Sequence, residues 1–466
     1  MSKWMMVFVG VVGWVVSLGS TICHADPPRR GLDRETIQSF AQPLIDGQAV
    51  RSVVVGVVQG DQRLTVPLQS TSASDSSKPF GGGGGEKPLH EIGSITKVFT
   101  SLLLADAVER GVLKLDDPVS LDGWDFPKFG DVAITYEHLA THRSGLPRLP
   151  AAIDSSGKTP NPYANFYAED AREFLASYQL TRQPGTAHEY SNLGAAVLGH
   201  IVADRQGMTY QELLHRRIAE PLGIAPEDLT TGGMDRIAPP HSDFDTETIV
   251  WEFADLPGAG GIHASMDAMT TFANACLHPP DNELGRAIER TWNQRVPRTA
   301  GAFAMGLGWM IAGDGSTRWH NGRTGGSTST LFVNRDLDAA VIVLADTGSP
   351  HVMPVGELLV QRLAGMPVEP RTIDVVDEVT VPVDQMKRLE GRYVLAPNFE
   401  FDVKVQNDRL MVGVTQQPVL RVYPKSPTEW VYKAVNAKLV FELPDQGPAR
   451  ALVLHQNGVQ QRAPRK

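Results

Sequence analysis

Ser94 and Lys97 are the residues best suited to chemistry, and they lie three positions apart in the stretch EIGSITKVFT, residues 91–100. On a helix this spacing places both side chains on one face, one turn apart. The apolar residues that follow predict a helix over 95–110, so Ser94 should lie near unpaired backbone N–H groups and the positive end of the helix dipole. Ser94 is therefore a candidate nucleophile.

A Ser-x-x-Lys pattern is weak evidence when it stands alone, because it also describes a helix-capping serine followed by a surface lysine. The chain contains a second copy, Ser155 and Lys158, next to Gly157 and Pro160. We interpret that copy as a loop without fixed geometry. Companion residues must decide whether Ser94 is reactive, since a serine hydroxyl needs a base and donors for the developing oxyanion.

Tyr190 and Asn192 form the first companion group, in a loop that leads into a predicted helix over 192–205. A tyrosine can share in proton transfer if cations stabilise its phenolate, and Lys97 can act as a base if burial lowers its pKa. A similar Tyr-x-Asn, Tyr163 with Asn165, lies in a loop rich in Pro and Asn, and we interpret it as a turn.

The second companion group is WHNGRTGG, residues 319–326, which enters a β-rich run. Closely spaced glycines at a strand edge allow a substrate backbone to approach and present a free N–H to it. A simple hairpin turn is the alternative interpretation of this group taken in isolation.

The elements around these groups predict an α+β domain. We expect a helix over 33–48, a hairpin of strands 53–58 and 63–68, helices over 169–177, 192–205, 210–218 and 265–275, strands within 306–312, 317–320, 328–334 and 339–345, and a helix over 352–364. Strands from both ends of the domain should form one sheet, with a helical second lobe inserted between them. The serine- and glycine-rich segment 69–88, which includes five glycines at 81–85, is expected to be a flexible surface insertion.

The order Ser-x-x-Lys, Tyr-x-Asn, His-x-Gly resembles the serine β-lactamase and penicillin-binding superfamily, most closely class C β-lactamases, DD-peptidases and related esterases. The resemblance runs from about residue 35 to 364 and is supported by four further motifs: LATHRSGLP (139–147), PLG (221–223), GGIHAS (260–265) and MGLGW (305–309). It implies a class C β-lactamase-like fold and no cofactor or metal.

The resemblance also implies an acyl-enzyme mechanism. Ser94 would attack a carbonyl, Lys97 and Tyr190 would pass the proton, and Asn192 would orient Lys97 and the substrate amide.

On the late strand, the backbone N–H groups of Ser94 and Arg323 would form the oxyanion hole, and Gly322 and Thr324 would bind substrate beside it. His320 would supply a donor or a partial positive charge. Class C β-lactamases carry Lys where this chain has His320, whereas His occurs there in some DD-peptidases and D-aminopeptidases. We also expect the planar fork of Arg323 to bind a substrate carboxylate.

These implications favour a hydrolase of D-amino-acyl peptides of the cell wall, with possible turnover of β-lactams. A short-chain esterase and a penicillin-binding sensor that deacylates slowly are the alternatives. The expected partner is a small-molecule or peptide substrate.

Composition excludes other partners. The 466 residues are 42% hydrophobic and carry a net charge of −10 without a sustained basic run, which argues against nucleic acid and anionic membrane surfaces. His138 and His142 are four positions apart but lack a carboxylate in a metal-binding pattern, so we expect structural histidines.

Residues 1–25 read as a signal peptide, with Lys3 before an apolar run and Ala25 before the expected cut. We expect a periplasmic or secreted protein; the membrane would be a partner only if this segment stays uncleaved as an anchor. Cleavage would leave Cys276 as the one cysteine and exclude an intrachain disulfide.

The expected domains are the hydrolase domain over 26–368, a linker over 369–383 and a small all-β domain over 384–466. Short apolar runs between turns fit an antiparallel β-barrel or sandwich in this last part. We expect a barrel, because this part resembles the lipocalin-like domain of some superfamily members.

Overall fold

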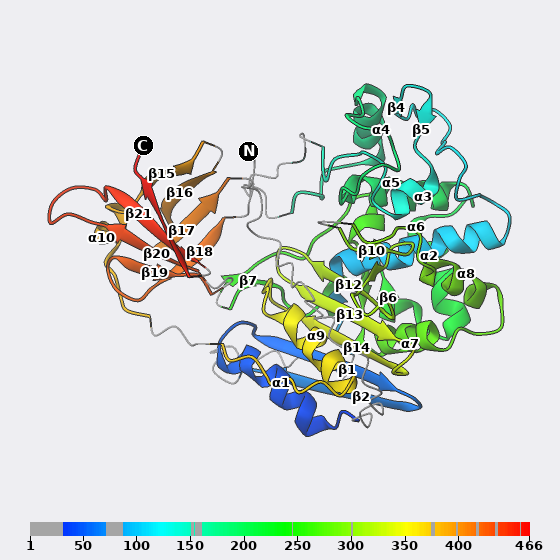
Figure 1. Cartoon of the computed structure of the whole chain (residues 1–466), viewed down its shortest axis with the longest axis horizontal. Coiled ribbons are helices and arrows are strands. Elements are labelled where there is room, and N and C mark those ends of the chain that lie inside the picture. Colours follow the sequence, from blue (N-terminus) through cyan, green and yellow to red (C-terminus); the bar gives the residue numbers. More distant parts are fainter. Residues whose placement is uncertain are drawn as a thin grey trace, which may run out of the picture.

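The computed structural model describes residues 31–70, 87–150, 153, 161–244, 246–299, 302–373, 378–397, 399–415, 419–433, 437–456 and 458–466. They form a large α+β domain and a smaller β domain beside it (Figure 1). The predicted signal peptide, the glycine run 81–85 and the second Ser-x-x-Lys at 155–158 lie outside the described residues.

The large domain is built on a seven-stranded antiparallel sheet whose strands come from both ends of the domain, as predicted. Its spatial order is β10 (Ala304–Met305), β11 (Met310–Ile311), β12 (Thr317–Arg323), β13 (Thr328–Asn334), β14 (Ala339–Ala345), β1 (Ser52–Gln59) and β2 (Gln62–Gln69). The strand expected within 306–312 is wrong in detail, because a bend at 306–308 separates β10 from β11. Gly308 has a φ of 72° there, which glycine adopts readily.

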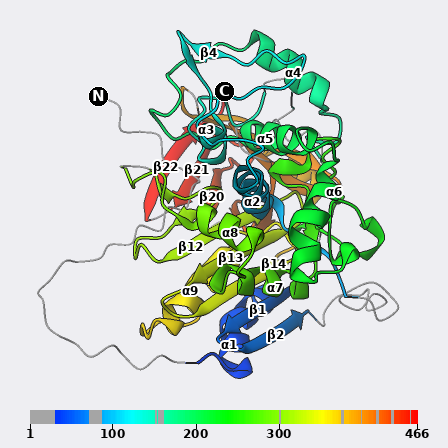
Figure 2. The ribbon, with the colours of Figure 1, turned by 90° about the vertical axis from the view of Figure 1, so that its right-hand side faces the viewer.

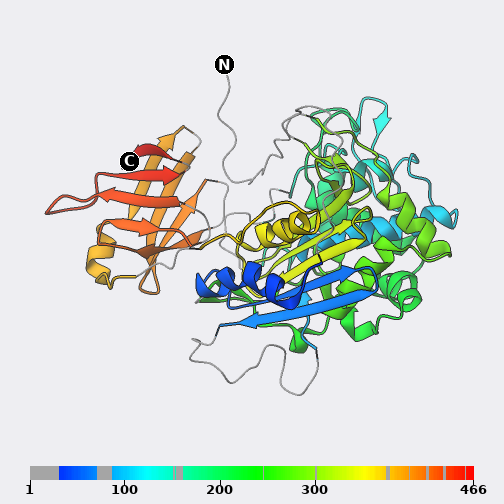
Figure 3. The same cartoon turned by 60° about the horizontal axis from the view of Figure 1, so that its bottom comes forward.

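The central strands are buried on both faces, which explains the long apolar runs in β1 and β14. In β14, Val341 and Val343 belong to one core while Ile342 and Leu344 belong to the other, as the two-residue repeat of a strand requires. Helices α1 (Arg34–Asp46) and α9 (Val352–Leu363) cover the first face (Figure 3), and α7 (Met266–Leu277) packs on the second.

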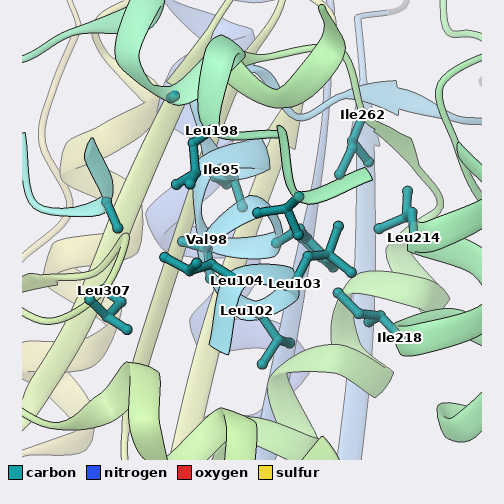
Figure 4. Packing of buried hydrophobic residues seen from close by; sticks show 14 of the residues in the cluster. Ile95, Val98, Leu102, Leu103, Leu104, Leu198, Leu214, Ile218, Ile262 and Leu307 are labelled. Carbon is teal, nitrogen blue, oxygen red and sulfur yellow. The ribbon is translucent and has the colours of Figure 1, made fainter. Parts of the chain in front are cut away.

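The helical lobe surrounds α2 (Thr96–Glu109), which follows the 3₁₀ turn η1 (Gly93–Ile95). Twelve consecutive α2 residues, Thr96–Ala107, are buried. Helix α2 lies among the other helices of the lobe (Figure 2), and its leucines belong to one apolar cluster with Leu198 and Leu214 (Figure 4). The neighbouring helices are α3 (Tyr136–Ala140), α4 (Ala168–Ser177), α5 (Asn192–Asp204), α6 (Tyr210–Leu214), the π turn η2 (His215–Ala219) and α8 (Glu283–Trp292). Helix α8 was not predicted, although Asn282 caps it.

Short pairs of strands and 3₁₀ turns complete the domain and position its loops. One three-stranded sheet, β3 (His90–Glu91), β9 (His263–Ala264) and β6 (Leu229–Thr230), fixes the backbone just before Ser94. The remaining pieces are β4 (Lys128–Phe129), β5 (Val132–Ala133), β7 (His241–Asp243), β8 (Thr246–Glu247), η3 (Glu220–Leu222), η4 (Pro226–Asp228), η5 (Met234–Arg236) and η6 (Pro257–Ala259).

The C-terminal domain is a nearly closed, eight-stranded antiparallel barrel that begins after α10 (Val383–Lys387). Its strands neighbour one another in chain order: β15 (Gly391–Ala396), β16 (Phe399–Gln406), β17 (Arg409–Val414), β18 (Leu420–Pro424), β19 (Glu429–Val431), β20 (Ala437–Glu442), β21 (Ala451–Gln456) and β22 (Val459–Pro464). A bridge between Tyr393 and Arg465 brings the first and last strands together. The barrel prediction is confirmed, although β15, β18 and β22 were not foreseen.

The two domains touch through a few polar contacts. Lys433 of the barrel donates to the Gln48 side chain at 3.2 Å, and Arg409 donates to the Thr246 hydroxyl at 2.5 Å. Among the described residues, no helix is both long enough and apolar enough to cross a bilayer.

Candidate active site

Ser94 and Lys97 meet at the start of α2, as their spacing predicts. Lys97 Nζ lies 2.9 Å from Ser94 Oγ and donates to the backbone oxygen of Ala259 at 2.6 Å. Ser94 is partly exposed, whereas Lys97 has only 2% of its surface exposed, because α2 runs through the centre of the core. A substrate can therefore reach the Ser94 hydroxyl while the Lys97 amine stays shielded from solvent.

Burial lowers the pKa of Lys97 well below its ordinary value, and the positive charge of Arg148 lowers it further. A neutral amine has two N–H groups and one lone pair. One N–H must serve the Ala259 carbonyl, so the lone pair is available to accept the Ser94 proton. This geometry suits a general base.

Tyr190 lies beside both Ser94 and Lys97. Ser94 interacts with the Tyr190 hydroxyl and opposes part of the rise in its pKa, and Lys97 Nζ lies 5.0 Å from the centre of the Tyr190 ring. Desolvation nevertheless raises the pKa of Tyr190 to about 12. A neutral phenol is thus the resting form, which suits Tyr190 to relaying a proton and argues against the phenolate base.

Two local contacts hold Tyr190 in place. Ser191 caps α5 by accepting from Gly194 N at 2.9 Å, and its backbone N–H donates to Nδ1 of His142 at 3.2 Å. The His142 ring then lies 4.3 Å from the Tyr190 ring, centre to centre. His142 is structural, as expected, and its position beside Tyr190 was not foreseen.

Asn192 differs from expectation in its partners. Its Nδ2 donates to the Tyr163 hydroxyl at 2.7 Å, and its Oδ1 has no hydrogen-bond partner among the described residues although it is buried. No hydrogen bond joins Asn192 to Lys97 within those residues. A buried acceptor left open in this way is costly unless a ligand supplies the donor.

Tyr163 therefore belongs to the site, although its sequence context predicted only a turn. The turn is present over 162–165, and the Tyr163 ring stacks on Phe253 at 4.6 Å. That contact depends on a residue ninety positions away, so no local pattern could reveal it.

His320 projects from β12 and is almost fully buried. Burial lowers its pKa to about 3, and protonation of Lys97 would disfavour a charge on the ring further, so the expectation of a partial positive charge is not supported. Its Nδ1 lies 2.7 Å from the backbone oxygen of Asn321, which can only accept. In the neutral ring Nε2 is then an acceptor. It has no partner among the described residues, and so the expected donor role is also unsupported.

Glycines bring β12 against the nucleophile segment. A Cβ on Gly93 would lie 2.7 Å from the backbone nitrogen of Arg323, and one on Gly322 would lie 1.9 Å from the oxygen of Ile92. Beside the turn that joins β12 to β13, Thr324 N donates to Ser327 O. The next pair away from the turn is Arg323 with Thr328. Since pairs alternate along an antiparallel ladder, the Arg323 N–H points away from β13 toward Gly93 and Ser94.

The side chains of Thr324 and Arg323 make internal contacts. The Thr324 hydroxyl accepts from Ser327 N at 3.1 Å and from Gly326 N at 3.4 Å, so it shapes the turn instead of facing a substrate. The Arg323 guanidinium donates to Gly348 O at 2.7 Å.

Glu91 is a buried carboxyl that the sequence analysis did not single out. It accepts from Trp251 N at 2.8 Å and from the Ser327 hydroxyl at 3.0 Å, and burial raises its pKa to about 7. It ties the strand before Ser94 to the turn after Arg323, and so it braces both halves of the expected oxyanion hole.

The part of the chain that the structure describes contains no candidate metal site. There, no group of three or more His, Cys, Asp or Glu side chains is placed to hold an ion. His138 Nδ1 instead accepts from the backbone N–H of Thr135 at 3.2 Å, within a helix cap.

Comparison with known proteins places this arrangement in a family. The family model described as Beta-lactamase matches residues 37–365. The D-alanyl-D-alanine-carboxypeptidase/endopeptidase AmpH of Escherichia coli K12 is 25% identical over 300 residues, covering 59% of this chain and 73% of that protein.

Two solved structures share the fold. The octameric penicillin-binding protein homologue from Pyrococcus abyssi has a TM-score of 0.58 at 21% identity and covers 92% of this chain and 100% of its own. The class C β-lactamase from Rhodobacter sphaeroides has a TM-score of 0.56 at 23% identity, over 68% of this chain and 96% of its own. With the family model matched over most of the large domain, the chain belongs to the Beta-lactamase family of serine hydrolases.

Proposed function

We propose that the chain is an exported peptidase of the penicillin-recognising type, which cleaves D-amino-acyl peptides through an acyl-enzyme on Ser94 and also reacts with β-lactams. The observation that carries this proposal is the open, buried Oδ1 of Asn192, because an amide N–H is the donor that such substrates bring. The relationship to AmpH, whose name states a carboxypeptidase and endopeptidase activity, supports the same substrate class.

The proposed reaction begins with proton transfer from Ser94 to the lone pair of neutral Lys97, as Ser94 Oγ bonds to the substrate carbonyl carbon. The backbone N–H groups of Ser94 and Arg323 stabilise the oxyanion. Tyr190 gives its proton to the leaving nitrogen and recovers one from Lys97, and the C–N bond breaks. Water then hydrolyses the ester on Ser94 and restores its hydroxyl.

Neutral His320 gives this chemistry a particular character. A lysine at this position would hold a fixed positive charge, whereas the Nε2 of His320 accepts a hydrogen bond. We infer that it accepts from the Tyr190 hydroxyl or from a substrate N–H, and that a substrate carboxylate must find its cation elsewhere.

Short-chain ester hydrolysis is the second candidate, favoured by one observation: burial shifts the pKa of Lys97, of Tyr190 and of His320 toward the uncharged form of each side chain. Such a site does not require an anionic substrate. An alkoxide leaving group also needs less protonation than an amine.

One panel of substrates tests these alternatives. Purified protein and Ser94→Ala are assayed on a chromogenic cephalosporin, a D-Ala-D-Ala peptide and a short p-nitrophenyl ester. Ser94-dependent release of D-Ala supports the peptidase, and turnover of the ester alone supports the esterase. Stable labelling by a fluorescent penicillin without turnover would instead indicate a sensor.

Export is proposed from the leader-like segment 1–25. N-terminal sequencing of protein recovered outside the cytoplasm should begin at Asp26 if Ala25 is the cleavage site. An intact N-terminus in the membrane fraction would contradict cleavage.

A further inference from the structure

Arg148 is a cation at the opening of the site that the mechanism above does not use. It is exposed, and its guanidinium carbon lies 5.2 Å from the centre of the Tyr190 ring. Its backbone oxygen accepts from Asn192 N at 3.0 Å and from Leu193 N at 3.3 Å. These bonds anchor Arg148 at the start of α5, beside the open Oδ1 of Asn192.

The charge of Arg148 has no counter-charge among the described residues. Among the residues that the structure describes, no carboxylate pairs with its guanidinium and no carbonyl accepts from it. By contrast, Arg323 of β12 donates to Gly348 O, and Arg182 pairs with Glu189. A positioned guanidinium with spare donors is suited to two-point binding of a carboxylate.

The field of this cation reaches the reacting groups. Arg148 contributes to lowering the pKa of Lys97, and it opposes the rise that burial imposes on the pKa of Tyr190 and of Tyr163. A ligand bound at Arg148 therefore lies close to the nucleophile, on the wall formed by Tyr190 and Asn192.

We propose that Arg148 binds a carboxylate on the acyl portion of the substrate, so that the enzyme prefers acyl groups that carry a negative charge. The proposal rests on the function proposed above, in which Asn192 holds the acyl-side amide. It assigns Arg148 a different group from the one expected for Arg323, which lies on the β12 wall. The substrate class becomes acyl-D-amino acids with an acidic acyl side.

The test uses two p-nitrophenyl esters that differ only in charge: those of N-glutarylglycine and its amide counterpart, N-glutaramylglycine. The measured quantity is the ratio of kcat/KM for the two. A charged hydrogen bond is commonly worth about 1.5–3 kcal/mol, so wild type should prefer the glutaryl ester by ~10- to 100-fold. This preference should fall as NaCl screens the exposed charge.

In Arg148→Met the ratio should fall to about one, and Arg148→Lys should recover part of it. Arg143→Met is the matched control, because it removes the same charge five residues upstream and should keep the wild-type ratio. A ratio unchanged in Arg148→Met would overturn the inference. An equal loss on both esters would also overturn it, since Arg148 would then act only through Lys97 and Tyr190.

The same two acyl groups, glutarylglycyl and glutaramylglycyl, attached to D-Ala-D-Ala give a pair of peptides. These peptides distinguish a failure of this inference from a failure of the proposed function. Ser94-dependent ester turnover without D-Ala release would refute the peptidase but leave the ester ratio readable. Ester turnover that persists in Ser94→Ala would show that Ser94 is not the nucleophile, and it would refute both the proposed site and the inference about Arg148.

Discussion

Gly322→Ala should disable the oxyanion hole without touching a reacting side chain. The added Cβ would lie 1.9 Å from Ile92 O and 2.4 Å from Ser329 Oγ, both parts of the nucleophile and sheet framework. Reaching even 3.0 Å from Ile92 O requires β12 and the 92–94 segment to separate by about 1.1 Å. That movement would pull the Arg323 N–H away from the Ser94 N–H.

The magnitude follows from this displacement. A misplacement of about 1 Å in a catalytic group, or the loss of one oxyanion donor, costs roughly 100-fold or more in kcat. The Ser329–Ile92 hydrogen bond, 2.8 Å long, would also be disturbed, for about 1 kcal/mol of folding free energy. The variant should therefore remain folded while catalysis collapses.

The assay combines kcat on a p-nitrophenyl ester with thermal unfolding. Gly413→Ala in the barrel is the matched control, since its Cβ would meet Val419 at an ordinary 3.4 Å. A boronic acid that mimics the tetrahedral intermediate should lose affinity for Gly322→Ala in proportion to kcat. A folded Gly322→Ala protein with wild-type kcat would refute the placement of the oxyanion hole.

Three further predictions concern residues around the site. Burial raises the pKa of Glu91 to about 7 in the folded protein, so its folded form holds the proton more tightly than the unfolded chain does. Its contribution to stability is thus present at low pH and is lost as the pH rises from about 4.5 to 7, by up to ~3 kcal/mol. Denaturant unfolding of the wild type should show the free energy of unfolding falling over this pH range. Glu91→Gln should lack this fall. Tyr163→Phe removes the partner of Asn192 Nδ2 and should raise KM for amide substrates roughly five- to tenfold, with a smaller effect on simple esters. Arg323→Ala should raise KM for substrates with a carboxylate on the leaving group more than for their amides, and equal KM changes for both would dismiss that role.

The local sequence was sufficient to predict features that depend only on residues close together in the chain. The contact between Ser94 and Lys97 follows from helical spacing alone, and β13 and β14 have the predicted bounds because turns delimit both of these β-rich segments. The strand predicted within 306–312 contains β11 but misses β10, since a two-residue strand carries almost no periodic signal. Strand β22, with the polar sequence VQQRAP, lacks the alternation by which strands are recognised.

The residues that were missed are defined by distant contacts. Glu91 meets Ser327 across 236 positions and Trp251 across 160, so its bracing role exists only in the folded chain. The charge state of His320 likewise depends on burial beside Lys97. Arg148 follows a motif that was noticed, yet nothing in the motif shows that its guanidinium reaches Tyr190.

Trapping of the acyl-enzyme tests the central claim most directly. The protein is incubated with a penicillin, quenched in acid and digested, and the modified peptide is identified by mass spectrometry. The structure predicts one adduct, on Ser94, that is absent from Ser94→Ala and forms slowly in Lys97→Ala. An adduct on another residue, or equal labelling of Ser94→Ala, would contradict the assignment of Ser94 as the nucleophile.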